Sequence, residues 1–305
     1  MTKKIHPLLT VLFIVVAASS AQAQELPVLE GPYLGQEPPG EEAELFAPGF
    51  ISTEHHEFSC CLSPDGREFY FTRRIPGRDL NRILVTRLEE SGWTEPQPAP
   101  MAGVSGGFEP TLSPDGKRLY FQATALDPHL GPSMDVWYTD RTSAGWNGPT
   151  KMRDPFTPGK AMYVTETSNG TIYTTDISQG PGTERLVLSR PADGNYSEYE
   201  PLPSPVNSPS GEIYPFIAPD ESYIVFTSLG REGGRAAGLY VSFRSKQGAW
   251  SEPAHVATGQ PNSTMPWVSP DGKYLFFTSN SGSLNGDIYW VDAAVFKKLR
   301  PENLE

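Results

Sequence analysis

The sequence predicts an all-β fold, a β-propeller with five four-stranded blades, and a six-bladed ring is the alternative. The first observation is a turn that recurs ahead of an aromatic strand, with copies at Leu62–Gly66, Leu112–Gly116, Ile217–Glu221, Val268–Gly272 and a degenerate Asn169–Gly170. The second is the period: the Asp or Asn residues of these turns are 50, 54, 51 and 51 residues apart, which is typical of propellers and solenoids. The third is composition, because 29 Gly and 31 Pro residues supply turns while 15 Phe and 13 Tyr supply a core.

The second repeat shows the parts of one blade most clearly. We expect a first strand at Phe108–Leu112, a tight turn at Ser113–Gly116, a second strand at Arg118–Gln122, a third at Asp135–Thr139, and a fourth after Gly145-Trp146. Pro at the second position of the turn and Asp-Gly at its end favour a tight turn, and the flanking β-branched and aromatic residues favour strands. Each repeat is therefore predicted to form one small antiparallel sheet.

The remaining repeats carry the same parts in the same order. The first repeat is expected to have its second, third and fourth strands at Arg67–Phe71, Ile83–Arg87 and Trp93–Pro98. In the third repeat these strands are expected at Ile172–Tyr173, Leu186–Ser189 and Tyr196–Glu198, and in the fourth at Tyr223–Thr227, Leu239–Phe243 and Trp250–Pro253. The last repeat has strands at Tyr274–Thr278 and Ile288–Val291 but no outer strand, whereas Ala43–Pro48 resembles an outer strand without a blade. We expect this N-terminal strand to close the ring, because closure removes exposed sheet edges. A β-solenoid is the competitor, but it would not explain the exchange between the termini.

The N-terminus predicts export. Lys3 and Lys4 precede an apolar run at Leu8–Ala18 and an Ala-Gln-Ala site ending at Ala23, so residues 1–23 are interpreted as a signal peptide. Residues 24–42 form a Pro/Gly-rich N-terminal lead, and residues 43–301 a single propeller domain. No other stretch approaches the roughly 20 apolar residues of a membrane span. We therefore expect a periplasmic or secreted protein.

The net charge bears on the possible partners, and the cysteine content bears on disulfide formation. The chain has a net charge of −12, which should repel nucleic acid. The only cysteines are Cys60 and Cys61. Neighbouring strand residues point to opposite faces, so an ordinary disulfide between them is awkward, and we expect one buried and one semi-exposed thiol.

Several motifs together resemble a known family. The Ser-Pro-Asp-Gly repeats, each followed by an aromatic strand, the ending Asp287–Val291 and the Pro-rich entry Gly31–Gly35 resemble the TolB-type, WD-repeat-like propellers. The resemblance covers residues 31–301. It implies an exported propeller that acts as a binding platform.

The candidate binding face is the one that carries the connections entering the first strand and leaving the second strand of each blade. These connections gather around the channel mouth of propellers, whereas the Ser-Pro-Asp-Gly turns lie on the other face and their Asp residues should cap their own turns. The repeats share the residues that build the scaffold, so the residues that differ between repeats are the ones expected to carry the function. The candidate ligand-binding residues on this face are His55, His56, Glu57, Arg73, Glu109, Asp176, Glu212 and Tyr214.

Two chemistries are open at this face. His55, His56 and Glu57 have the residue types of a metal site, but adjacent residues of an extended segment point apart, and a solvated loop is favoured. Arg73 and Arg74, with Arg78 nearby and with Arg231 and Arg235 in another connection, suit a carboxylate, phosphate or uronate group, but pairing with surface carboxylates is favoured. No metal or cofactor is predicted.

Other candidates have ambiguous positions. Glu166 stands where the other repeats have an apolar residue. We expect a slip of register there, and the alternative is a buried acid with a shifted pKa. The aromatic residues Tyr163, Tyr214 and Trp267 lie on or beside the first strands. They are expected to pack between blades, and the alternative is stacking on sugar rings.

The predicted function is non-catalytic binding of an envelope protein partner or a glycan. The alternative is a glycoside hydrolase-like enzyme with its site at the channel mouth, so enzymatic activity stays open. Such an enzyme needs two ionisable groups that converge across the mouth, and a binding module does not.

Overall fold

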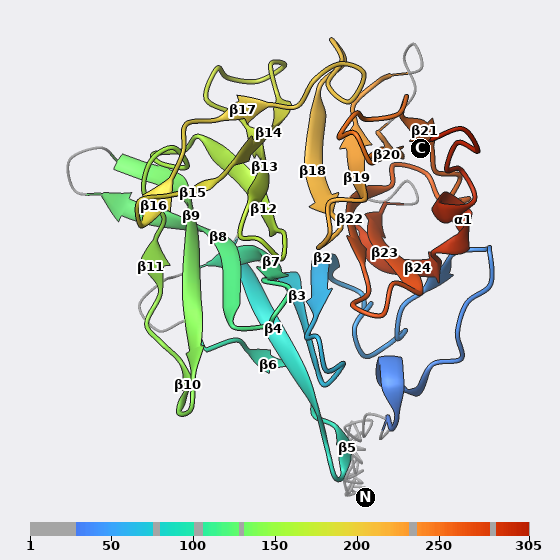
Figure 1. Cartoon of the computed structure of the whole chain (residues 1–305). Coiled ribbons are helices and arrows are strands. Elements are labelled where there is room, and N and C mark those ends of the chain that lie inside the picture. The colour runs from blue at the N-terminus through green and yellow to red at the C-terminus, as the bar shows by residue number, and fades with distance from the viewer. Residues whose placement is uncertain are drawn as a thin grey trace, which may run out of the picture.

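The fold is a ring of five antiparallel sheets (Figure 1). The computed structural model describes residues 29–75, 80–100, 106–127, 131–231, 237–280 and 285–304. The first strands of successive sheets contact one another around a central channel, and those of the first and last sheets complete the ring. The five-bladed propeller predicted from the repeat is confirmed. The predicted signal peptide, residues 1–23, lies outside the described residues.

Each blade contains strands in the order first, second, third and outer. The first blade consists of β2 (His56–Leu62), β3 (Glu68–Ile75), β4 (Leu80–Glu89) and β6 (Gln97–Pro98). The second consists of β7 (Gly107–Leu112), β8 (Arg118–Asp127), β9 (Gly131–Thr142) and β11 (Thr150–Lys151). The third consists of β12 (Ala161–Glu166), β13 (Ile172–Asp176), β14 (Arg185–Ser189) and β17 (Glu200–Pro201). The fourth consists of β18 (Glu212–Ile217), β19 (Tyr223–Ser228), β20 (Gly238–Phe243) and β21 (Ala254–His255).

The last blade draws its strands from both ends of the chain. It consists of β22 (Thr264–Val268), β23 (Tyr274–Ser279), β24 (Asp287–Asp292) and, as outer strand, β1 (Glu44–Leu45). In β1, Glu44 pairs with Trp290 and Leu45 with Tyr289. The ring is therefore closed by the N-terminal segment, as the sequence predicts.

The short elements extend or cover the blades. Small strands prolong three of the third strands as hairpins: β5 (Gly92–Trp93), β10 (Gly145–Trp146), and the pair β15 (Pro191–Ala192) and β16 (Asn195–Tyr196). The helices are η1 (Pro32–Gly35) and α1 (Ala294–Lys297). Within the part of the chain that the structure describes, no helix is long and apolar enough to cross a membrane.

The outer strands lie further along the chain than the sequence interpretation places them. Tyr196 belongs to the hairpin extension, and the outer strand of that blade is β17, which pairs with β14. In the fourth blade Trp250 makes only an isolated bridge to Arg244, and β21 follows it. In both blades the aromatic residue, Tyr196 or Trp250, therefore lies at the end of the hairpin, where its ring packs on the blade. The outer strand begins further along the chain.

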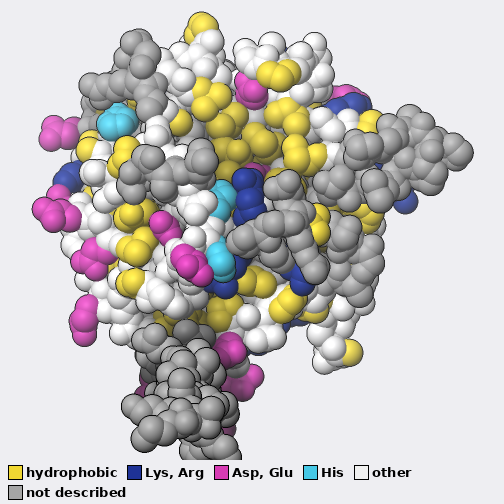
Figure 2. All heavy atoms as spheres, turned by 180° about the vertical axis from the view of Figure 1, so that it is seen from behind, with side chains coloured by type: hydrophobic (Ala, Val, Ile, Leu, Met, Phe, Trp, Pro, Cys, Tyr) yellow, Lys and Arg dark blue, Asp and Glu magenta, His cyan; other side chains and the backbone are white. Residues whose placement is uncertain are grey.

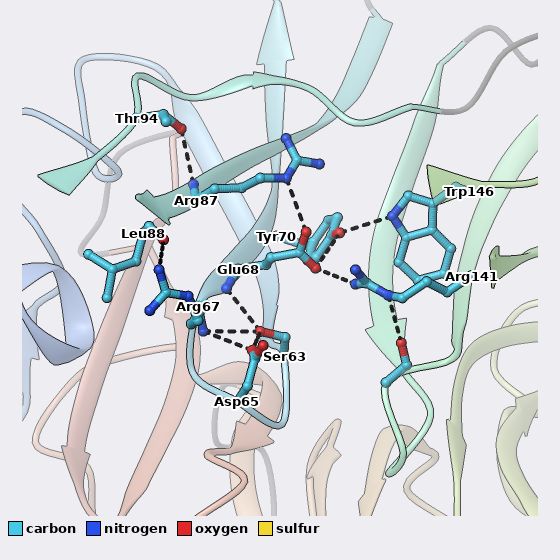
Figure 3. A network of polar contacts seen from close by, with 11 residues as sticks. Ser63, Asp65, Arg67, Glu68, Tyr70, Arg87, Leu88, Thr94, Arg141 and Trp146 are labelled. Atoms are coloured by element: carbon cyan, nitrogen blue, oxygen red, sulfur yellow. Dashed lines mark hydrogen bonds and ion pairs between the residues drawn. The ribbon is translucent and has the colours of Figure 1, made fainter. Parts of the chain in front are cut away.

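The Ser-Pro-Asp-Gly turns are capped by their own side chains. In the first blade the Asp65 carboxylate accepts hydrogen bonds from the Ser63 hydroxyl at 2.5 Å and the Arg67 amide at 3.0 Å (Figure 3). The turns at Asp115 and Asp271 repeat both bonds. The prediction that these carboxylates serve their own turns is confirmed.

Figure 3 also shows how the first two blades are joined on the turn face. Glu68 pairs with Arg87 of its own blade and with Arg141 of the second blade. Trp146 of the second blade donates its indole N–H to the Tyr70 hydroxyl at 3.3 Å. These polar contacts link the second strand of the first blade, β3, to the third strand and hairpin extension of the second blade, β9 and β10.

A bulge interrupts the first strand of every blade. The bulge residues are non-glycine residues in the left-handed region: Ser59 at φ 48°, Glu109 at 56°, Tyr163 at 57°, Tyr214 at 55° and Met265 at 53°. In four blades a Thr hydroxyl on the second strand of the adjacent blade accepts the bulge N–H: Thr278 from Ser59, Thr72 from Glu109, Thr175 from Tyr214 and Thr227 from Met265. The bonds stabilise a strained conformation and join the blades around the channel.

Replacing Thr278 with Val should therefore cost about 1–3 kcal/mol of unfolding free energy, because it leaves the buried Ser59 amide without an acceptor. The change keeps the shape of this buried side chain. The matched control is Thr150→Val on the exposed outer strand β11, which should stay within about 0.5 kcal/mol of wild type. Urea denaturation measures both, and equal losses would contradict this role of Thr278.

Two further expectations from the sequence are wrong. Glu166 pairs with Ile172, just as Leu62 pairs with Phe69 at the corresponding positions of the first blade. The strand register is therefore not shifted at Glu166. Glu166 is a half-buried acid that accepts a hydrogen bond from the Tyr120 hydroxyl at 3.0 Å, and burial raises its pKa. Both Cys60 and Cys61 are free and buried, because the bulge beside them and the neighbouring blades cover both faces of β2.

Candidate ligand-binding cavity at the channel mouth

A cavity of about 580 Å³ opens at one mouth of the central channel, on the predicted binding face. Four blades line it, with His56 and Arg74 from the first, Glu109 from the second, Tyr214 from the fourth and Asn280 from the last. Histidine and basic side chains gather beside a hydrophobic area in the middle of the view in Figure 2. The volume is in the range of small-molecule sites.

The bulges position the inner part of this cavity. Glu109, Tyr214 and Met265 line it, and each is a bulge residue. Tyr163, the bulge residue of the third blade, is fully buried and donates its hydroxyl to the Pro266 carbonyl of the last blade at 2.9 Å. The Tyr163 ring lies behind the cavity wall, 5.5 Å from the ring of Tyr214, centroid to centroid.

Glu109 is the most unusual group in the cavity wall. Its side chain is 4% exposed, and its Oε2 atom has no hydrogen-bond partner among the described residues. Burial raises the pKa of Glu109 to about 8, because the charged form loses its hydration. Glu109 is therefore a protonated carboxylic acid at neutral pH and can donate a hydrogen bond into the cavity.

Other polar groups of the wall complement this acid. His56 stacks on Phe58 with ring centroids 4.8 Å apart, and its Nδ1 accepts the Gly286 amide at 2.6 Å. Burial and the nearby Arg74 charge lower the pKa of His56, so its ring is neutral at neutral pH. Its Nδ1 also lies 3.3 Å from the Gly286 carbonyl oxygen. Asn280 has a buried Oδ1 without a partner among the described residues. The wall thus combines donors, an acceptor and apolar rings.

Glu57, one of the predicted site residues, serves the fold instead. Its buried carboxylate accepts hydrogen bonds from the Thr53 amide at 3.1 Å and the Thr53 hydroxyl at 2.6 Å, and it pairs with Arg73 Nε at 2.5 Å. Arg73 also bonds the Ile51 carbonyl at 3.2 Å. Together Glu57 and Arg73 hold the connection that leads into β2.

Glu212 repeats this arrangement in the fourth blade. It accepts bonds from the Ser208 amide at 2.8 Å and the Ser208 hydroxyl at 2.6 Å, and it pairs with Arg231 at 2.8 Å. Asp176 is likewise engaged, by Arg185 at 2.9 Å and by the Ser178 amide at 2.9 Å. These carboxylates are structural clamps.

Of the eight candidate residues, the cavity therefore brings together His56, Glu109 and Tyr214. His55 is half-buried beside Thr53 and is not part of the wall. The other aromatic candidates lie elsewhere: Tyr163 is below the cavity, and Trp267 packs against Phe276 in the core. Arg78 and Arg235 lie outside the described residues.

Sequence reasoning missed Asn262, Asn280 and Met265 in the wall, but a usable signal exists for Met265. Every bulge residue stands six positions before the Asp or Asn of its turn. Once one bulge residue is known, the bulge residue of every other blade can therefore be located by counting back six positions from the Asp or Asn of its turn. The two Asn residues lie outside the repeat pattern and carry no such signal.

Two other cavities are less suited to a ligand. One of about 450 Å³ lies between the second and third blades, and its charged groups are paired with each other or with the scaffold, Arg118 with Asp140 and Glu166 with Tyr120. The other, of about 150 Å³, is the opposite mouth of the channel, ringed by turn prolines. Neither has an unpartnered buried polar side chain among the described residues.

The fold and this cavity define a class: a five-bladed β-propeller with a cavity at one channel mouth. Among solved structures, the chain is similar to a putative TolB from Agrobacterium tumefaciens, with 16% identity, a TM-score of 0.54, and coverage of 80% of this chain and 79% of that one. TolB from Acinetobacter baumannii has 13% identity and a TM-score of 0.51, covering 80% of this chain and 59% of that one.

The α-L-arabinofuranosidase from Lactobacillus brevis has 13% identity and a TM-score of 0.50, with 79% of this chain and 91% of that one covered. At these identities the likeness concerns the fold alone. No family model matches the chain, and no curated protein matches it.

Proposed function

We propose that this protein is an exported, non-catalytic binding module that holds a small glycan in the cavity at the channel mouth. The observation that carries the proposal is the buried, unpartnered carboxyl of Glu109 at the wall of a cavity of about 580 Å³. A buried polar group without a partner is costly, and a ligand hydroxyl would satisfy it. A concave cavity whose wall combines polar side chains with the rings of Phe58, Phe108 and Tyr214 suits a small polar molecule such as a sugar better than a protein surface.

The alternative, a glycoside hydrolase, has less support in the geometry. Glu109 is the only carboxylate among the described residues that line the cavity. Hydrolysis of a glycosidic bond ordinarily needs two carboxylates at the bond, and Glu57 and Glu212 are committed to Arg73 and Arg231. The likeness to an arabinofuranosidase supports sugar binding only by analogy of fold.

The test is a thermal-shift and calorimetry screen of residues 24–305 against mono- and disaccharides, with a parallel assay for released reducing ends. We expect at least one sugar to raise Tm, because a ligand that binds only the native state stabilises it. Tyr214→Ala should weaken this sugar about tenfold or more. Tyr196→Ala, a half-buried tyrosine away from the cavity, should leave binding unchanged.

A screen in which no sugar binds, or equal binding by Tyr214→Ala and wild type, would contradict the proposal. Release of reducing ends that follows the same sugar preference would favour the enzyme instead.

A further inference from the structure

The cavity contains one uncompensated positive charge. Arg73 is neutralised by Glu57, whereas its neighbour Arg74 bonds only the neutral Asn81 side chain among the described residues, at 3.3 Å. Both Arg74 and Asn81 line the cavity. The Arg74 side chain is exposed to solvent, and its guanidinium is free to bind an acid group through paired N–H groups. A protein with a net charge of −12 therefore presents a local site for an acid.

The other titratable groups facing Glu109 do not supply a compensating negative charge. Burial raises the pKa values of Tyr163, Tyr214 and Cys60, so all three are uncharged near neutrality. His56 is neutral as well, and Glu109 is protonated there. The described wall therefore carries a charge of +1, from Arg74.

We propose that the ligand of this cavity is a sugar acid, whose carboxylate is balanced by Arg74 and whose binding requires Glu109 to carry its proton. The inference rests on the proposed function. A carboxylic acid O–H donated to a carboxylate is a short, charge-assisted hydrogen bond, and a guanidinium binds a carboxylate through paired N–H groups. The sugar hydroxyls can use Asn280 and Tyr214 in the same wall.

The proposal predicts a specific pH dependence. A uronate, with an ordinary carboxyl pKa near 3–4, stays ionised above about pH 5. As pH rises through about 8, Glu109 loses its proton, the donor disappears and two negative charges oppose each other. The affinity should therefore be full at about pH 6 and fall about tenfold or more by about pH 9.5.

Calorimetric titration tests this with D-glucuronate and D-galacturonate, their neutral parents glucose and galactose, and glucose 6-phosphate. At about pH 6 the uronates should bind about tenfold or more tightly than the neutral sugars. Glu109→Gln, which resembles the protonated acid, should keep that affinity and abolish its fall at high pH. Arg74→Gln should remove the preference for the acid, and Arg82→Gln, an exposed arginine outside the cavity wall, should not.

The outcomes separate the two proposals. Neutral sugars that bind as well as the uronates would overturn this inference and leave the proposed function standing. Tighter binding of glucose 6-phosphate would overturn the choice of a carboxylate, and an unchanged fall with pH in Glu109→Gln would overturn the role of its proton. If no probe binds, both proposals fail.

Discussion

Replacing Phe46 with Ala is expected to destabilise the protein by about 3–5 kcal/mol, as other large-to-small changes of buried aromatic residues do. Phe46 follows the closing strand β1, and its amide donates to the Ile288 carbonyl at 2.9 Å. Its fully buried ring lies 4.9 Å from Phe69 of the first blade and 5.1 Å from Trp290 of the last, centroid to centroid. The ring therefore packs across the junction where the propeller closes.

Urea denaturation followed by tryptophan fluorescence measures this change, since Trp290 is one of the contacts. The conservative variant Phe46→Leu should lose less, because most of the buried volume remains. Leu45→Ala, a partly exposed residue of the same strand, controls for disturbance of β1 itself. A loss below about 1 kcal/mol in Phe46→Ala would show that closure does not contribute to the cooperative stability of the ring.

Replacing Glu212 with Ala should cost a similar amount, about 3–5 kcal/mol, because it leaves a buried cation unpaired. The Arg231 side chain is only 16% exposed. Among the described residues it also donates to the carbonyls of Pro205 and Val206 and lies over the rings of Phe226 and Tyr240, none of which carries a negative charge. The Ser208 amide and hydroxyl lose their acceptor as well. The connection that leads into β18 should then lose its fixed conformation.

The matched control for this clamp is the exposed pair of Arg190 and Glu200, whose side chains are 52% and 58% exposed. Glu200→Ala should cost less than about 1 kcal/mol, since solvent screens such a pair. Denaturation by urea and hydrogen exchange in residues 207–212 provide the measurements. Equal small losses at both sites would show that the buried pair does not hold the connection.

The ion pairs of Glu57 and Glu212 explain why the sequence alone could not show which of the three glutamates, these two or Glu109, lines the cavity. Glu57 and Glu212 stand eight positions before their turn Asp residues, and Glu109 stands six before its own. In a regular strand, residues two apart share a face, so all three acids would be equal candidates. The bulge breaks that alternation: Glu109 lines the cavity, whereas Glu57 pairs with Arg73 of β3 and Glu212 pairs with Arg231.

The repeat determined the architecture without help from tertiary structure. The turn period, the aromatic second strands and the orphan segment at Ala43–Pro48 together predict the number of blades and their closure. This is possible because each blade is a local unit whose turn and strand preferences depend on nearby residues. The face that carries the cavity also follows from the order of strands in each blade.

Only the tertiary structure decided which polar groups belong to the cavity. Three of the contacts around the cavity join different strands or blades. Arg73 pairs with Glu57, the Thr72 hydroxyl accepts the Glu109 amide, and the Tyr163 hydroxyl donates to Pro266 of the last blade. Burial by all the blades together, rather than residue type, raises the pKa of Glu109. The residue type of a glutamate does not show its role. Its surroundings in the folded ring decide whether it is a clamp or a proton donor.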